Sequence, residues 1–175
     1  MPTCLILAAA RTADRDFENR NFLVRIHRHH IIWNMNEIII EGRRISENAP
    51  VFVIAEAGVN HNGDIVLAEK MIDLAAKAGV DAVKYQTFRA DALVSRSAPL
   101  APYQAKNIGY GGTQYDMLRV LELDRDAHVR LQARARDVGI IFLSTPFDME
   151  SVEFLARLPV PAWKVGSGEL TNLPL

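Results

Sequence analysis

From residue 35 onward the sequence alternates apolar runs with amphipathic stretches, and this alternation is the feature that most limits the possible folds. Four apolar runs predict strands, at residues 51–56, 80–86, 140–145 and 161–165. The runs are nearly unbroken, as in strands that are buried on both faces, and helical periodicity lies between them. Because strands and helices that alternate in this way form a parallel sheet with helical cover, the sequence predicts an α/β fold.

Start and stop signals bound the predicted helices. The expected N-caps are Asp64, Asp124 and Asp148, and the expected ends are Gly79, Gly139 and Pro159. The periodicity of the first helix predicts a buried face that carries Leu67, Met71, Leu74, Ala75 and Ala78. A small β-hairpin is predicted over residues 37–46, and a short helix over 114–121 follows a long connection at 87–113.

Two parallel-sheet architectures are compatible with this pattern, a doubly wound sheet and a (β/α)8 barrel. No G-x-G-x-x-G sequence follows the first predicted strand, which argues against the dinucleotide-binding form of a doubly wound sheet. In a barrel, the active site is built at the carboxyl ends of several strands. Functional side chains are therefore expected at the strand ends.

Polar side chains follow or end each predicted strand. They are Glu56 after the first strand, Lys84 and Gln86 in the second, Ser144 and Thr145 in the third, and Lys164, Ser167 and Glu169 at the fourth. Since side chains alternate along a strand, Lys84 and Gln86 point one way while Val83 and Tyr85 point toward the helices, and Lys164 points away from the helices that Trp163 faces. Buried lysines need a partner, so we expect either a structural ion pair with Glu56 or, as we favour for two lysines together, an anionic substrate site. His61, in a turn sequence, is either a ligand or acid, or a residue that fixes the turn.

Composition excludes several classes of function. The formal net charge is −1, from 20 Lys and Arg against 21 Asp and Glu, which gives no electrostatic case for binding nucleic acid or an anionic membrane. Cys4 is the single cysteine, which excludes an internal disulfide framework and favours a cytoplasmic location. No apolar stretch approaches the ~20 residues of a membrane helix. Residues 1–34 lack the regular pattern, and we expect an unassigned extension ahead of a domain over residues 35–175.

Five segments taken together resemble the sialic acid synthase family, which includes N-acetylneuraminate, legionaminate and pseudaminate synthases. They are AEAGVNHNG at 55–63, VKYQTF at 83–88, YQAKN at 103–107, FLSTPFD at 142–148 and WKVGSGELTNLP at 163–174. The resemblance runs from about Met35 to Leu175, with the segments in the family's order.

This resemblance implies a fold, a reaction and roles for individual residues. The family's barrel domain is a (β/α)8 barrel, and its members join phosphoenolpyruvate to an N-acetylated amino sugar of the N-acetylmannosamine type, giving a nine-carbon 2-keto acid and phosphate. By motif match, Lys84, Thr145, Lys164 and Ser167 bind phosphoenolpyruvate. Gln86, Phe147 and Asn107 lie near the sugar, and Glu56 and Glu169 are the carboxylates of the site. The family also implies a divalent metal ion, Mn²⁺ or Mg²⁺, and a homodimer at full length.

The resemblance covers only part of the family's domains. A barrel takes ~250 residues, so residues 35–175 are expected to form its N-terminal half, about four βα units preceded by the hairpin. The family's metal-ligating histidines are expected in the other half, and we assign no metal ligand in this sequence. A half barrel has two free strand edges, so we expect this chain to be inactive alone and either poorly soluble or self-associating. Two alternatives stay open: a barrel enzyme that condenses phosphoenolpyruvate with a sugar phosphate, and a non-catalytic remnant.

Overall fold

The computed structural model describes residues 7–9, 37–100 and 112–175. Asn107 and, apart from residues 7–9, the predicted extension at 1–34 lie outside the described residues.

One sheet organises the described residues, and four of its strands are parallel. These strands are β4 (Ile54–Gly58), β5 (Ala82–Thr87), β6 (Ile141–Pro146) and β7 (Ala162–Lys164), and they lie side by side in chain order. A short strand, β1 (Leu7–Ala9), pairs antiparallel with β7, so this edge of the sheet is occupied and the prediction that it is free is wrong. The pairing residues of β1 come from the apolar start of the predicted extension.

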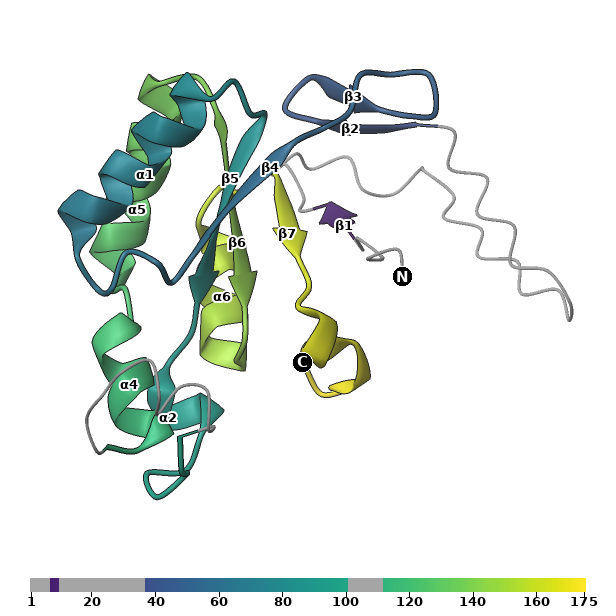
Figure 1. Ribbon diagram of the computed structural model, residues 1–175. Helices are drawn as coiled ribbons and strands as arrows, with labels where there is room; N and C mark the ends of the chain where they lie inside the picture. Colours follow the sequence, from purple (N-terminus) through teal and green to yellow (C-terminus); the bar gives the residue numbers. More distant parts are fainter. Residues whose placement is uncertain (1–6, 10–36, 101–111) are drawn as a thin grey trace, which may run out of the picture.

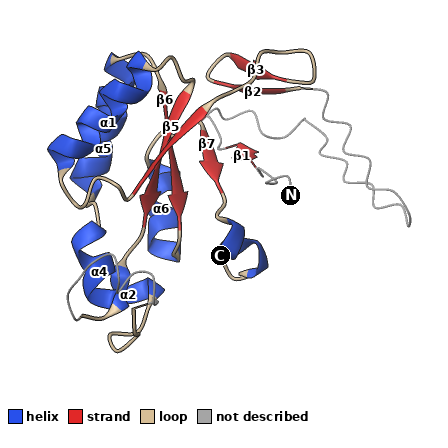
Figure 2. Ribbon diagram, in the orientation of Figure 1, coloured by secondary structure: helices blue, strands red, loops and turns tan. Residues whose placement is uncertain are grey.

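Helices α1 (Ile65–Lys77), α5 (Arg125–Asp137) and α6 (Met149–Arg157) cover one face of this sheet (Figure 1; Figure 2). The main core lies between them and the sheet, where the helix residues Ile72, Leu131 and Leu155 meet Val83 and Phe142 of the strands. A doubly wound sheet reverses its strand order and carries helices on both faces. The described strands advance in chain order under helices on one face, which is the arrangement of consecutive βα units in a barrel. Closure into a (β/α)8 barrel remains a prediction.

The predicted N-caps are confirmed at all three helices. The Asp64 carboxylate accepts hydrogen bonds from the backbone N–H groups of Val66 and Leu67, at 2.8 and 3.2 Å. Asp124 and Asp148 bind the first turns of α5 and α6 in the same way. Such caps satisfy donors that have no partner within the helix. Gly79 follows α1 with a φ of +77°, a conformation that favours glycine.

The predicted buried face of α1 is partly wrong. Ala68, Ile72 and Ala75 are its buried residues, whereas Leu74 is 56% exposed and Ala78 is also exposed. Small side chains let α1 approach the sheet so closely that the Tyr85 hydroxyl donates to the Ala68 carbonyl at 2.7 Å. Periodicity selects large apolar side chains, but the close approach depends on alanines.

The face of the sheet opposite the helices is here called the inner face. It carries Ala82, Lys84 and Gln86 of β5, together with the side chains on the neighbouring strands that are in register with them. A hairpin of β2 (Ile38–Ile40) and β3 (Arg43–Ile45) confirms the predicted one and packs against the amino end of this face. Ile40 of the hairpin lies in one apolar cluster with Ala82, Leu143 and Ala162. The hairpin therefore closes the end of the inner face away from the lysines.

The remaining strands and helices differ from the predictions mainly at their bounds. The first parallel strand begins at Ile54 instead of residue 51, and Val51 is 83% exposed, because its neighbour β5 begins only at Ala82. The long connection contains an unpredicted short helix, α2 (Ala90–Leu93), before the confirmed helix α4 (Gln114–Leu121). A 3-10 helix, η1 (Ser167–Thr171), follows β7. Among the described residues, no helix is long and apolar enough to cross a membrane.

Candidate functional site

A carboxylate between two ammonium groups lies at the carboxyl end of the inner face. Glu56 Oε2 is 2.6 Å from Lys84 Nζ, and Glu56 Oε1 is 4.0 Å from Lys164 Nζ. The Lys84 side chain is 4% exposed, whereas that of Glu56 is 54% exposed. The sheet produces this arrangement directly, since Glu56 and Lys84 are register partners in β4 and β5. The structural ion pair that we considered is therefore present, and it places two cations together at the predicted position.

Strand parity is confirmed by contacts on both faces. Tyr85 packs on α1, and Trp163 contacts the core beneath the helices, while Lys84 and Lys164 turn to Glu56. Gln86 and Thr145 are register partners beyond Lys84 on the same face. The Thr145 hydroxyl is buried and has no hydrogen-bond partner among the described residues. A buried hydroxyl without a partner is costly, so it is a group that a bound ligand would satisfy.

Phe147 and Glu169 meet at Gly166, between β7 and η1. A methyl group on Gly166 would lie 3.2 Å from Phe147 Cε1 and 3.6 Å from Glu169 Cγ, so only glycine fits without displacement of Phe147. The Glu169 carboxylate accepts a hydrogen bond from Asn172 Nδ2 at 2.7 Å. Ser167 is exposed at the start of η1. In the described part of the chain, no hydrogen bond or ion pair joins Ser167 or Glu169 to the Glu56–lysine cluster.

Ser144 lies on the other side of the sheet from Thr145, so its inclusion among the polar groups at the lysine end is wrong. Its hydroxyl is 2.6 Å from Thr87 Oγ1, which is 2.8 Å from His128 Nε2. His128 Nδ1 lies 2.8 Å from the Asp124 carbonyl, so Nδ1 carries the proton and Nε2 accepts. The order of donation is therefore Ser144 to Thr87 to His128. Burial lowers the pKa of His128, which favours this neutral ring.

His61 fixes the turn between β4 and α1. Its imidazole is fully buried, and Nδ1 accepts a hydrogen bond from the Gly63 N–H at 3.0 Å, while Nε2 has no hydrogen-bond partner among the described residues. Asn62 and Gly63 both have positive φ, and this turn packs against the Val120 carbonyl of α4. Burial, and to a lesser extent the nearby His128, lowers the pKa of His61. The Nδ1 contact matches the interpretation of His61 as a turn residue, and the interpretation as a ligand or acid stays a prediction.

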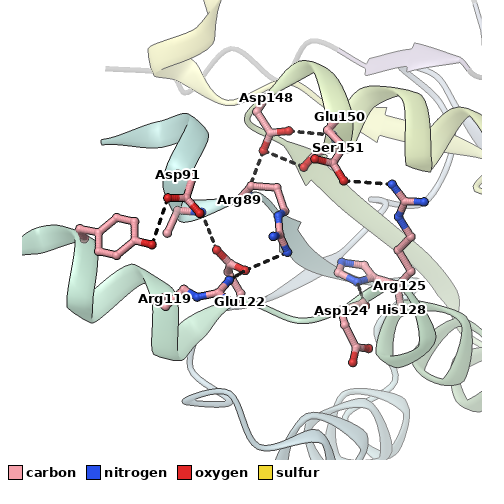
Figure 3. A network of polar contacts seen from close by, with 12 residues as sticks. Arg89, Asp91, Arg119, Glu122, Asp124, Arg125, His128, Asp148, Glu150 and Ser151 are labelled. Carbon is pink, nitrogen blue, oxygen red and sulfur yellow. Dashed lines mark hydrogen bonds and ion pairs between the residues drawn. The ribbon is translucent and has the colours of Figure 1, made fainter. Parts of the chain in front are cut away.

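A polar network beside the strand ends was missed from the sequence. Glu122 accepts hydrogen bonds from Arg119 Nη1 at 2.6 Å, from Arg89 Nη1 at 3.1 Å and from the Ala90 backbone N–H at 2.6 Å (Figure 3). Asp148, predicted only as a helix cap, also accepts from the backbone N–H of Arg89. The contacts of Arg89 and Ala90 join residues 32 to 59 positions apart, whereas Arg119 and Glu122 are three positions apart. No local sequence pattern indicates the contacts of Arg89 and Ala90.

A cavity of about 410 Å³ lies beside this network, on the helix side of the sheet. Its lining includes Thr87, Arg89, His128, Glu150 and Phe154. Arg125 spans part of it, 3.0 Å from Glu150 Oε1 and with its guanidinium over the Phe154 ring. The cavity is separate from the Glu56–lysine cluster, because Thr87 and His128 lie on the face opposite Lys84.

Metal ligands do not gather in the described residues. Across 7–9, 37–100 and 112–175, no three His, Cys, Asp or Glu side chains come together as they would around a metal ion. Glu56 is engaged with the lysines and Glu169 with Asn172. This part of the chain therefore does not supply a complete metal site.

Comparison with known proteins adds three findings. Residues 71–175 match the model of the NeuB family. The chain is 50% identical over 123 residues to N,N'-diacetyllegionaminic acid synthase of Legionella pneumophila, covering 70% of this chain and 35% of that protein. It is 40% identical over 133 residues to human N-acetylneuraminate-9-phosphate synthase, covering 76% of this chain and 37% of that protein.

Solved structures agree with these sequence matches. The fold is similar to that of N-acetylneuraminic acid synthetase from Leptospira borgpetersenii in complex with citrate, with a TM-score of 0.65 and 30% identity over 79% of this chain and 44% of that one. It is also similar to the spore coat polysaccharide biosynthesis protein SpsE from Bacillus subtilis, with a TM-score of 0.56 and 32% identity. The chain spans 35% to 38% of the length of the curated relatives that it matches.

Proposed function

The chain belongs to the NeuB family, and from this premise we propose that it supplies part of the active site of a synthase that condenses phosphoenolpyruvate with an N-acetylated amino sugar of the N-acetylmannosamine type. The products would be a nine-carbon 2-keto sugar acid and phosphate. The observation that carries the proposal is the pair of ammonium groups, Lys84 and Lys164, around Glu56 at the carboxyl end of the inner face. Compact cations at such a position suit a phosphate and a carboxylate.

The binding roles follow the geometry and the family resemblance together. Lys84 and Lys164 hold the anionic groups of phosphoenolpyruvate. The Thr145 hydroxyl, which has no partner among the described residues, donates to an oxygen of the phosphate or the carboxylate. Ser167, exposed at the start of η1, is a further donor. Gln86 and Phe147, with Asn107 in the segment outside the described residues, border the sugar.

The reaction needs charge stabilisation and proton transfer. C3 of phosphoenolpyruvate forms a bond to the sugar aldehyde carbon, and the aldehyde oxygen takes a proton. Water then adds to C2 with loss of a proton. As the C2–O(phosphate) bond of the tetrahedral intermediate breaks, the C2 hydroxyl becomes the ketone and its proton leaves with the phosphate. Glu56 or Glu169 moves one of these protons, while the lysines stabilise the anionic groups throughout.

The architecture and assembly are part of the same proposal. Four parallel strands in chain order, with helices on one face, support the N-terminal half of a (β/α)8 barrel. A homodimer at full length and a cytoplasmic location remain proposals. A divalent ion, Mn²⁺ or Mg²⁺, is implied by the family resemblance, but the described residues do not form a complete set of ligands for it. No step above runs through it.

Phosphoenolpyruvate binding tests the proposal without requiring turnover by a chain that spans a third of its relatives. Binding to the whole chain would be measured by calorimetry and by ³¹P NMR. We expect Lys84→Ala and Lys164→Ala each to weaken the affinity by about 10-fold or more, because each removes a charge-assisted contact. Lys70→Ala, which removes an exposed lysine of α1, is the matched control. Equal affinity in the Lys84 and Lys70 variants would reject the assignment.

Acceptor choice would be tested where turnover is measurable. N-acetylmannosamine would be compared with arabinose 5-phosphate and erythrose 4-phosphate in a phosphate-release assay. Preference for a sugar phosphate would replace the proposed acceptor class while keeping the phosphoenolpyruvate site.

A further inference from the structure

We propose that Asp148 is a positioning residue that ties the exits of β5 and β6 together and so sets the spacing between Gln86 and the Thr145–Phe147 segment. The inference rests on the proposed function, since those residues border the proposed substrates. Asp148 itself would touch no substrate.

The contacts of Asp148 differ from those of an ordinary helix cap. Oδ1 accepts from the Ser151 backbone N–H at 2.8 Å, which is the cap of α6. Oδ2 accepts from the Ser151 hydroxyl and from the Arg89 backbone N–H, both at 2.8 Å (Figure 3). Asp148 as a residue is 7% exposed, so these contacts are shielded from water. The hydrogen bonds of the Asp64 and Asp124 side chains, in contrast, come from backbone N–H groups of their own helices.

The Arg89 contact extends the pairing of β5 and β6 past the end of the sheet. Gln86 and Thr145 are register partners, and the Phe147 N–H then donates to the Thr87 carbonyl at 3.1 Å. The next link along both chains is the Arg89 N–H to the Asp148 carboxylate. Backbone pairing thus continues into a backbone-to-side-chain bond, and the two exits leave the sheet in a fixed relation.

Glu122 holds the same segment from the other side. It accepts from the Ala90 N–H and the Arg89 guanidinium, so the charge of Arg89 is directed to Glu122 and Asp148 receives only the backbone donor. The contribution of Asp148 to Arg89 is therefore a single hydrogen bond. It can be removed without disturbing an ion pair.

Substitution by serine separates the two roles of Asp148. Serine is a good N-cap, and its one oxygen serves the Ser151 N–H, so Asp148→Ser keeps the cap of α6 and loses the contact to Arg89. Asp124→Ser makes the same change at the cap of α5, which has no bond to a second strand exit. D148S also loses the hydrogen bond from the Ser151 hydroxyl, so it should lose more stability than D124S. Ser151→Ala, which removes that hydroxyl and keeps the Arg89 contact, is the control for this second loss.

Two measurements on the whole chain decide the matter. Amide hydrogen exchange should be about 10-fold faster at Arg89 in D148S than in wild type, with the Ser151 amide still protected, because one hydrogen bond is lost and the cap is kept. Phosphoenolpyruvate affinity should fall by about 10-fold in D148S, since small displacements of binding groups are costly, and stay within about 2-fold of wild type in D124S.

The possible failures are distinguishable. An unchanged rate of amide exchange at Arg89 in D148S would show that Asp148 does not link the two strand exits, and it would leave the proposed function unaffected. Equal affinities in D148S and D124S would reduce Asp148 to a helix cap. Absence of phosphoenolpyruvate binding by the wild-type chain would overturn the proposed function, and with it the effect on substrate that this inference assigns to Asp148.

Discussion

The unequal burial of the Glu56–Lys84 pair leads to an asymmetric prediction for stability. Lys84 is 4% exposed and Glu56 is 54% exposed, with 2.6 Å between Nζ and Oε2. When Glu56 becomes Gln, the buried ammonium loses its counter-charge and still faces Lys164. When Lys84 becomes Met, the carboxylate that remains can be hydrated. Removal of the acid should therefore destabilise the fold more than removal of the buried base.

The magnitude follows from distance and screening. Two unit charges at this separation attract by about 6 kcal/mol at an effective dielectric constant of 20, and by about 2 kcal/mol in bulk water. Glu56 is half hydrated, and the Gln side chain keeps one acceptor, so Glu56→Gln should cost about 2 kcal/mol. Lys84→Met should stay within about 1 kcal/mol of wild type, because it also removes the cost of burying a charge.

Urea unfolding followed by circular dichroism provides the assay. With a slope near 2 kcal/mol per molar urea, Glu56→Gln should lower the midpoint by about 1 M. The double variant E56Q/K84M should recover most of that loss. Glu69→Gln is the control, since Glu69 makes a bidentate pair with Arg130 at 2.6 Å on the surface and should lower the midpoint less than Glu56→Gln. A midpoint for Lys84→Met at or below that of Glu56→Gln would refute the argument from burial.

Three further predictions concern the regions around the site. Thr87→Val should lower the free energy of unfolding by about 2 kcal/mol and Ser144→Ala by about 1 kcal/mol. The valine leaves both Ser144 and His128 without a partner, whereas the alanine keeps the hydrogen bond from Thr87 to His128. Equal urea midpoints for the two variants would contradict the assigned order of donation. Gly79→Ala should lower the free energy of unfolding by about 1 kcal/mol, and Gly63→Ala should lower it more. Both glycines have a φ of +77°, but only a Cβ at Gly63 meets the Val120 carbonyl. The unfolding midpoints of the two variants test this difference. Burial lowers the pKa of His61 and of His128 from 6.5, so the unfolded chain binds protons more readily than the folded chain. Stability should therefore be full above about pH 6.5 and fall as the pH drops through the lowered pKa values. His128→Gln should flatten this pH dependence, and an unchanged slope of urea midpoint against pH in that variant would contradict the prediction.

Much of the site follows from local patterns in the sequence. Strand parity alone separates Lys84 and Gln86 from Val83 and Tyr85, and the structure places these side chains on the predicted faces. The helix caps follow from residue type at the first turn. These features are predictable because each depends on neighbours within a few positions.

Other features depend on contacts between distant segments. The exposure of Leu74 reflects how closely α1 approaches the sheet at Ala68, which no periodicity reports. Ser144 was misplaced because it was grouped with Thr145 as a polar residue at a strand end, although their parity is opposite. The second role of Asp148 arises from a residue 59 positions away.

The hairpin at the amino end of the inner face has a consequence for engineering. Ala82, in its apolar cluster with Ile40 and Leu143, is only two positions from Lys84, yet the two side chains meet different surroundings. Repacking Ile40 with its hairpin neighbours Ile38 and Ile45 would change the stability of the domain, while Leu143, the register partner of Lys84, stays in place. A library confined to those hairpin positions would therefore vary the stability of the domain without replacing a side chain in register with Lys84.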